Sequence, residues 1–173
     1  VSADGLSTTV QYDANGNSLA ESQTTDVTMI HADGSTTRTI TDSTLSGGTA
    51  GSANPVYTVT GKDKAVIDKS ADGLSTTTQW DLTGSGTFTE HESVVTVLNS
   101  NGSSTKTTSF YVGAALKSRM EVTDGADGLT KTTKWDTTGA GTFDQVAVYT
   151  NVVNADGSMT ETTANSTGAG ALF

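Results

Sequence analysis

The residues best suited to bind a ligand are three aspartates that each follow an aromatic residue and begin a glycine-rich loop. These loops read DANGNS from Asp13, DLTGSGTF from Asp81 and DTTGAGTF from Asp136. Calcium loops place oxygen ligands at alternate positions and use glycine for the sharp bend. The first loop keeps such oxygens on Asp13, Asn15 and Asn17, whereas hydroxyls or alanine replace the later ligands in the other two. Two interpretations stay open: the loops bind calcium as a cofactor, or each aspartate only caps its own turn.

No arrangement of nucleophile, acid and base indicates an enzyme. The two histidines, His31 and His91, have no paired ligand at the spacing of a metal site. Glu90 and Glu92 share one face of an expected strand, but a carboxylate pair of this kind occurs only once and needs a cleft. The sequence contains no nucleophile elbow, phosphate-binding loop or zinc-protease motif. We therefore expect no catalytic residues.

Charge and composition narrow the class of protein. The formal net charge is −10, from 9 basic and 19 acidic residues, so neither nucleic acid nor anionic membrane is an expected partner. There is no cysteine, and no apolar stretch reaches the ~20 residues that span a bilayer. Only 33% of residues are hydrophobic, but alternating runs rich in threonine and valine, with a single proline, favour strands over disorder. The composition predicts an all-β chain with essentially no helix.

A repeat is the strongest pattern in the sequence. Pairs of Asp-Gly or Asn-Gly turns recur, and the two glycines of each pair are 29 positions apart (34 − 5, 102 − 73 and 157 − 128). Such dipeptides between alternating runs predict β-hairpins, with type I′ turns as the expected form. The turn glycines are Gly5, Gly34, Gly73, Gly102, Gly128 and Gly157.

The turn spacing divides the chain into three units. Unit boundaries are expected at 1–70, 71–125 and 126–173, the third unit being truncated. The period is 55 residues between Gly73 and Gly128 but 68 between Gly5 and Gly73. The excess of 13 matches the segment 43–55, STLSGGTAGSANP, which is expected to be an inserted surface loop.

Each unit is expected to contain four strands. In the second unit these cover 74–81, 87–99, 103–112 and 116–123, with a β-bulge near 91–94 that turns Phe88 and Val95 to one face. Tyr12, Trp80 and Trp135 are expected to form the recurrent core. Because such thin units bury little alone, they are expected to stack into an elongated rod or wound sheet. The alternative is two or three small β-sandwich domains.

The segments QYDANGNS and QWDLTGSGTF, which follow Asp-Gly turns and threonine-rich strands, resemble a known family type. They are similar to the repeat tracts of large secreted hemolysin-type (RTX-like) calcium-binding proteins and adhesins of Gram-negative bacteria. The segment 11–18 is also similar to YD (RHS-type) repeats. The resemblance implies type I export and assembly or adhesion at the cell surface.

These observations lead to two functional hypotheses. The first is an extracellular structural protein at the bacterial cell surface, a subunit of an appendage, matrix fibre or adhesin stalk that self-associates into fibres or head-to-tail polymers through strand edges. The second is a cation-assisted polysaccharide-binding module that uses the polar surface and the segment 43–55.

Overall fold

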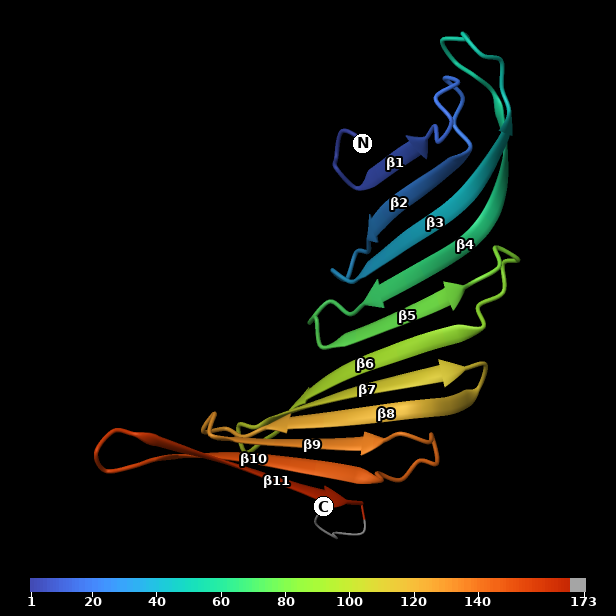
Figure 1. The fold of residues 1–173 in the computed structure, drawn as a ribbon. Helices are drawn as coiled ribbons and strands as arrows, with labels where there is room; N and C mark the ends of the chain where they lie inside the picture. The colour runs from blue at the N-terminus through green and yellow to red at the C-terminus, as the bar shows by residue number, and fades with distance from the viewer. Residues whose placement is uncertain (169–173) are drawn as a thin grey trace. The chain divides into compact units, whose positions relative to one another are not determined.

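The computed structural model describes residues 1–168, and within them every regular element is a β-strand (Figure 1). The prediction of an all-β chain without helices is confirmed for this part of the chain. The strands form one open antiparallel sheet in which the spatial order equals the chain order. The strands are β1 (Ser7–Tyr12), β2 (Ser22–Ile30), β3 (Thr36–Gly47), β4 (Tyr57–Lys69), β5 (Ser75–Asp81), β6 (Glu90–Leu98), β7 (Ser104–Val112), β8 (Ala115–Asp124), β9 (Thr130–Asp136), β10 (Gln145–Val153) and β11 (Met159–Thr167).

The strands expected in the second unit are all present as β5 to β8, with ends that differ from the expected ones by at most three residues. The largest shift is at β6, which begins at Glu90 rather than at position 87. Phe88 therefore lies outside the strand. The bulge near 91–94 was expected because Phe88 and Val95 had to face the same side of one strand. Since Phe88 is not part of β6, that reason for a bulge no longer applies.

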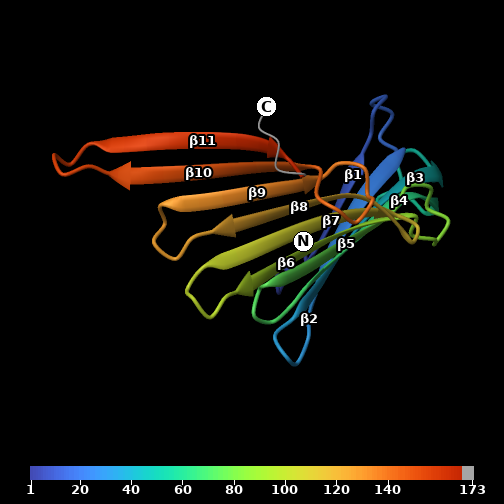
Figure 2. The same cartoon turned by 90° about the horizontal axis from the view of Figure 1, so that it is seen from below.

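By internal contacts the chain divides into two compact units. The first comprises residues 1–73 and 77–91, and the second comprises residues 74–76 and the chain from 92 onward. In the first unit β1 to β4 form a meander of antiparallel hairpins. In the second, β7 to β11 do the same, and β9, β10 and β11 lie side by side (Figure 2).

Neither unit encloses a core of the expected kind. Among the described residues only Leu45 and Ala147 are apolar and buried. Tyr12 is 51% exposed, and Trp80 and Trp135 are half-buried, so the prediction of a core built on these aromatics is corrected. The physical reason is that the strands form one open sheet rather than two packed sheets, so neither face of a strand is covered by a second layer. The same observation argues against the β-sandwich alternative.

The hairpin turns were expected to be type I′, and the structure shows a different turn type. All six turn glycines have positive φ, between 69° and 87°. In the turn that follows β2, the N–H of Gly34 donates to the His31 carbonyl at 3.0 Å, and the N–H of His31 donates to the Ser35 carbonyl at 2.9 Å. Asp33 does not have positive φ. The turn is thus a type I turn with glycine in the following left-handed position, not type I′.

The segment 43–55 is only partly a loop. β3 continues through it to Gly47, and Ser43 and Leu45 are buried. The loop proper is 48–56, and the backbone N–H of Ala20 donates to the Tyr57 hydroxyl at 3.0 Å. The extra residues therefore lengthen the β3–β4 hairpin, and the N–H of Leu45 donates to the Glu21 carbonyl at 2.7 Å.

Both long hairpins carry a β-bulge on their second strand. In the β3–β4 pair, Asp42 lies opposite Asp63 while Ser43 lies opposite Gly61, which leaves Lys62 as the extra residue. In the β7–β8 pair the same shift leaves Lys117 as the extra residue. A bulge bends its strand and increases the local twist. The loop that begins at Asp81 packs on the bulge at Lys62, and the loop that begins at Asp136 packs on the bulge at Lys117.

Candidate functional site

The candidate site is the set of three aspartate loops, residues 13–20, 81–88 and 136–143. Each loop follows an aromatic residue, leads to the next strand and has the same length. Each is closed by one backbone hydrogen bond from the residue after the loop to the carbonyl of the aromatic residue before it. These bonds join Glu21 to Tyr12 at 2.9 Å, Thr89 to Trp80 at 3.0 Å and Asp144 to Trp135 at 2.7 Å.

The Asp136 carboxylate is fully buried inside its own loop. Its Oδ1 accepts hydrogen bonds from the backbone N–H groups of Thr138 at 3.3 Å and Ala140 at 3.1 Å. Its Oδ2 accepts one from the N–H of Gly141 at 2.7 Å. The side chain thereby satisfies backbone donors that the tight loop cannot pair internally.

Asp81 holds the second loop in the same way, and 1% of it is exposed. Its carboxylate accepts backbone N–H bonds from Thr83 at 3.1 Å, Ser85 at 3.2 Å and Gly86 at 2.6 Å. Asp13 has the same pattern in the first loop, with bonds from the N–H groups of Gly16 and Ser18, but it is exposed.

Burial and hydrogen bonding act in opposite directions on these carboxyls. Burial is the largest single influence on Asp81 and Asp136, and it raises the pKa because it disfavours the charged form. The backbone donors of the loop together outweigh it, so the pKa of each carboxyl lies below its usual value. Both groups are ionised near neutral pH, and their charge is compensated by amide dipoles.

The predicted cation ligands are therefore directed at backbone donors. In the first loop Asn15 Oδ1 accepts the N–H of Asn17 at 3.0 Å, and Asn17 Oδ1 accepts the N–H of Leu19 at 2.9 Å. Among the described residues no group of three or more acidic or histidine side chains could together hold a metal ion. The geometry matches that of self-capped turns, and calcium binding by Asp13, Asn15, Asn17, Asp81 and Asp136 stays a prediction.

The second and third loops rest on the bulged strands through one glycine each. A Cβ built on Gly139 would lie 2.2 Å from the Leu116 carbonyl oxygen and 2.9 Å from the Lys117 Cα. A Cβ on Gly84 would lie 2.6 Å from the carbonyl carbon and oxygen of Gly61. Both glycines also have positive φ. Only glycine permits this backbone contact, which places the second loop on the bulge of β4 and the third loop on the bulge of β8.

A cation also covers the aromatic ring at the end of each of these loops. The Arg119 guanidinium lies 4.3 Å from the centroid of the Phe143 ring, and the Lys64 ammonium lies 5.7 Å from that of Phe88. Arg119 also donates to the Gly141 carbonyl at 2.9 Å. Sequence reasoning missed these contacts, although the shared Gly-Thr-Phe ending of the two loops was a signal for them.

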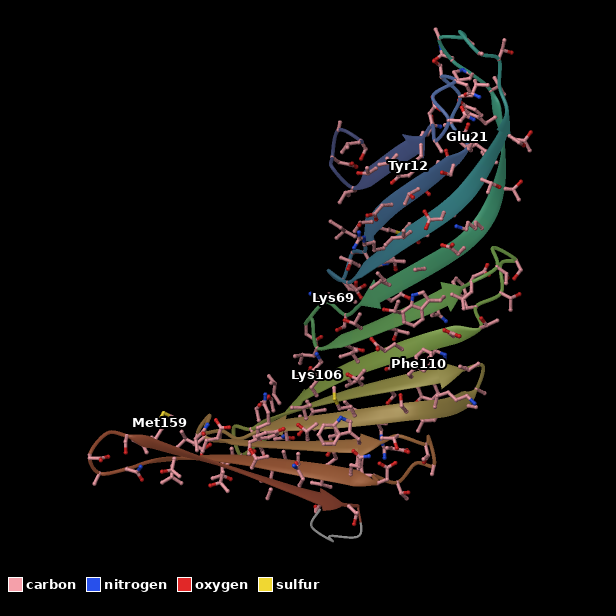
Figure 3. The ribbon with its side chains drawn as sticks, viewed as in Figure 1. Tyr12, Glu21, Lys69, Lys106, Phe110 and Met159 are labelled. Atoms are coloured by element: carbon pink, nitrogen blue, oxygen red, sulfur yellow. The ribbon has the colours of Figure 1, made fainter. Side chains whose placement is uncertain are left out.

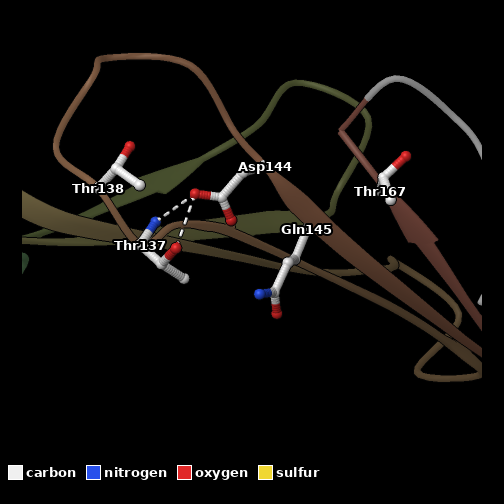
Figure 4. A pocket seen from close by; sticks show the side chains of 5 residues that line it. All are labelled: Thr137, Thr138, Asp144, Gln145 and Thr167. Atoms are coloured by element: carbon white, nitrogen blue, oxygen red, sulfur yellow. Dashed lines mark hydrogen bonds between the residues drawn. The ribbon is translucent and has the colours of Figure 1, made fainter.

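An acidic side chain follows the first and third loops and contacts them. Glu21, which is labelled in Figure 3, accepts the N–H of Ala14 at 2.8 Å and the side-chain amide of Asn15 at 2.5 Å. Asp144 Oδ2 accepts the N–H of Thr137 at 2.7 Å and its hydroxyl at 2.8 Å (Figure 4). Sequence reasoning did not identify the contact of Glu21 with its loop.

A cavity of about 380 Å³ lies beside Asp144. All of its lining side chains carry oxygen (Figure 4). Asp144 Oδ1 is buried and has no hydrogen-bond partner in the described part of the chain. The lining residues are Thr137, Thr138, Asp144, Gln145 and Thr167.

The first unit contains a further acidic contact that the sequence did not indicate. Asp42 and Asp63 lie opposite each other in the β3–β4 pair, and the Thr24 hydroxyl donates to Asp42. Burial, followed by the charge and hydrogen bond of Asp42, raises the pKa of Asp63, and the charge of Asp81 acts in the same direction. The ionised form of Asp63 is therefore less favourable in the folded protein than in the unfolded one.

Replacing Asp63 with asparagine is expected to stabilise the protein at pH 7, with a rise in the midpoint of thermal unfolding of about 2 °C. Because the pKa of Asp63 is raised in the folded protein, ionised Asp63 lowers the free energy of unfolding. This loss of stability is absent below the unfolded pKa and grows as pH rises through the folded pKa. The same substitution should thus give no gain at pH 3. Calorimetry at both pH values tests this, and an equal gain at pH 3 would contradict it.

The remaining polar candidates are separate from the loops. His31 lies in the turn after β2, within 2.9 Å of the Thr37 hydroxyl. His91, Glu90 and Glu92 all lie in β6 and are half-buried. In the part of the chain that is described, no helix has the length and apolar character needed to cross a membrane. No protein-family model, curated protein or solved structure matches this chain.

Proposed function

We propose that this chain is an extracellular structural protein, a subunit of a surface appendage, matrix fibre or adhesin stalk that assembles through its strand edges. The observation that carries this proposal is the sheet order. Within the described residues, β1 and β11 each have a hydrogen-bonded neighbour on one side only. Exposed strand edges are templates for pairing with another chain.

The composition of the two edge strands supports edge pairing. Proteins protect such edges with lysine, proline or inward-pointing charge. β1 reads STTVQY and has no charged residue, and β11 reads MTETTANST and has only Glu161. Neither strand contains lysine, arginine or proline. The edges are therefore open to strand addition.

The recurrence of local structure supports stacked repeat units of about 55 residues with four strands each. β2, β6 and β10 each contain nine residues. The bulged lysines, the glycine contacts and the cation–ring pairs each recur 55 positions later: 62 and 117, 84 and 139, 64 and 119, 88 and 143. The proposed units are 1–70, 71–125 and 126–173, continuing as a wound sheet or rod.

The proposal places the protein outside a bacterial cell. The resemblance to hemolysin-type repeat tracts and YD repeats supports type I export and a role at the cell surface. An acidic chain without cysteine fits that setting. In this role function resides in the assembled shape, and no catalytic step is proposed.

Sedimentation velocity with parallel negative-stain imaging tests strand-edge assembly. The wild-type protein at about 100 µM is expected to form species larger than a monomer, which requires an association free energy of about −5.5 kcal/mol. Val10→Lys on β1 should return it to the monomer. Val27→Lys on the inner strand β2 is the matched control, because Val10 and Val27 are 43% and 44% exposed.

The same experiment distinguishes the role of calcium. Assembly that requires calcium and is lost with chelator would support cation binding at the aspartate loops. Assembly that is the same with calcium and with chelator would support the interpretation that each aspartate only caps its own turn. A monomer at every concentration would contradict the structural proposal.

A cation-assisted polysaccharide-binding module is the second candidate function. The observation in its favour is the cavity beside Asp144, whose Oδ1 has no hydrogen-bond partner among the described residues. In this case calcium-dependent binding on a glycan array should be lost in Asp144→Ala, because the Asp144 side chain lines the cavity. Binding that survives this substitution would show that the saccharide does not bind in this cavity.

A further inference from the structure

A second cavity lies on the sheet of the second unit, away from the aspartate loops. Its volume is about 350 Å³, within the range of roughly 300–1,000 Å³ that is common for small-molecule sites. Its lining includes one aromatic ring, one side-chain amide and three charged groups. These residues are Asp124, Leu129, Lys131, Tyr149, Asn151 and Glu161.

Strand register brings the functional groups of this cavity to one face of the sheet. Tyr149 and Asn151 are two positions apart on β10, so their side chains point to the same face. Lys131 of β9 lies opposite Tyr149, and Glu161 of β11 lies opposite Asn151. Directly opposed residues share a face. The four side chains therefore surround one patch, which we call the Tyr149 groove.

The floor of the groove is fixed by backbone bonding. The N–H of Asn151 donates to the carbonyl of Leu129 at 2.8 Å. Lys131 forms an ion pair with Asp124 at 3.3 Å. These contacts hold the edges of the groove without using the Asn151 side chain.

The polar groups of the groove are available to a ligand. Tyr149 is 36% exposed. Within the described residues no hydrogen bond is made by the Tyr149 hydroxyl, the Asn151 amide or the Glu161 carboxylate. One exposed ring with unsatisfied donors and acceptors around it is a common arrangement for a polar ligand that has an apolar face.

Comparison with the other two copies shows which features are structural. The bond to the leucine carbonyl recurs: Thr28 donates to Leu6 at 2.8 Å, and Thr96 donates to Leu74 at 2.7 Å. This bond therefore belongs to the scaffold of the repeat.

The side chains of the groove do not recur. Counted from the turn glycines, the positions of Tyr149 and Glu161 are occupied in the first copy by Asp26 and Arg38, which form an ion pair at 2.6 Å. In the second copy they are occupied by Val94 and Lys106. The aromatic ring with an amide and a carboxylate is present only in the third copy, where it has no scaffold role.

We propose that the Tyr149 groove binds an uncharged saccharide. The tyrosine ring offers an apolar face to the C–H groups of a pyranose, and the Asn151 amide and Glu161 carboxylate can pair with its hydroxyls. The two carboxylates of the groove and the net charge of −10 disfavour acidic sugars. No cation is needed. Strand-edge assembly uses the backbone edge of β11, whereas the groove lies on a face of the sheet, outside the segment 48–56.

Titration of ¹⁵N-labelled protein by NMR tests the groove. The probes are cellohexaose, laminarihexaose and mannohexaose, added in the presence of chelator, with an acidic oligogalacturonate as the charged comparison. At least one neutral hexasaccharide is expected to shift the amide signals of Leu129, Lys131 and Asn151. Tyr149→Ala should weaken that binding about tenfold or more, and Tyr149→Phe should weaken it less.

Tyr12→Ala is the matched control, because Tyr12 is an exposed tyrosine outside the groove, and it should change affinity less than about twofold. The proposal is overturned if no neutral probe shifts groove signals at concentrations up to about 10 mM. It is also overturned if binding requires calcium, or if binding is lost on replacing residues 48–56 but kept in Tyr149→Ala. Sedimentation of the same samples reports on strand-edge assembly separately.

Discussion

Gly139→Ala is expected to destabilise the second unit by about 3 kcal/mol or more. Two costs act together. The residue has a φ of 72°, which is unfavourable for alanine, and its Cβ would lie 2.2 Å from the Leu116 carbonyl oxygen. That oxygen belongs to backbone in a bulged strand, so it cannot move aside as a flexible side chain would. Urea unfolding followed by tryptophan fluorescence measures the loss.

Gly141→Ala in the same loop separates the two costs. Gly141 has a φ of 84°, and a Cβ placed there would meet nothing within 4 Å. Only the backbone cost of about 1–2 kcal/mol is expected. Gly84 and Gly86 form the equivalent test and control in the second loop. Equal losses from Gly139→Ala and Gly141→Ala would show that the loop does not rest on the bulge.

Asp136→Asn is expected to lower the midpoint of thermal unfolding by about 5 °C or more at pH 7. Asparagine has nearly the same shape, but its NH₂ group would face backbone donors that the carboxylate now satisfies. Asp13→Asn is the control, because Asp13 has similar backbone bonds in an exposed loop. A shift of less than about 2 °C is expected there.

The pH dependence of stability in the same variants tests whether the charge of Asp136 causes the expected loss. The folded pKa of Asp136 is lowered, so its stabilising contribution is complete above the unfolded value of about 3.9 and is lost as pH falls through the folded pKa. The wild type and Asp13→Asn should lose stability steeply below about pH 4, and Asp136→Asn should lose less. Parallel curves for all three would mean that the Asp136 charge does not hold the loop.

Local patterns in the sequence predicted the strands well. Alternation and the Asp-Gly turns located β5, β7 and β8 to within one residue at either end. The inserted segment was found by its effect on the period, but its first residues are strand, because Leu45 and Ser43 are buried beside neighbouring strands. Composition alone does not show such a contact.

The parts that sequence could not supply depend on contacts across strands. Tyr12, Trp80 and Trp135 were expected in a core because apolar alternation does not show whether a second layer covers the sheet. The backbone contacts of Gly84 and Gly139 are made with the bulges at Lys62 and Lys117. These bulges are visible only in the pairing register of the strands. The aspartates of the loops could be located from the sequence, but their hydrogen bonds to backbone N–H groups depend on how each loop folds, which residue types alone do not show.

The identity of spatial order and chain order has a mechanical consequence. Each strand is hydrogen-bonded only to strands adjacent in the chain, so a pulling force applied along the polypeptide reaches the sheet one edge strand at a time. Strands should peel off in turn at low force, each nine-residue strand releasing roughly 30 Å of chain. Because the contacts are local, each strand can pair again once the load falls. Such a sheet would extend and recover under shear instead of breaking at a single threshold.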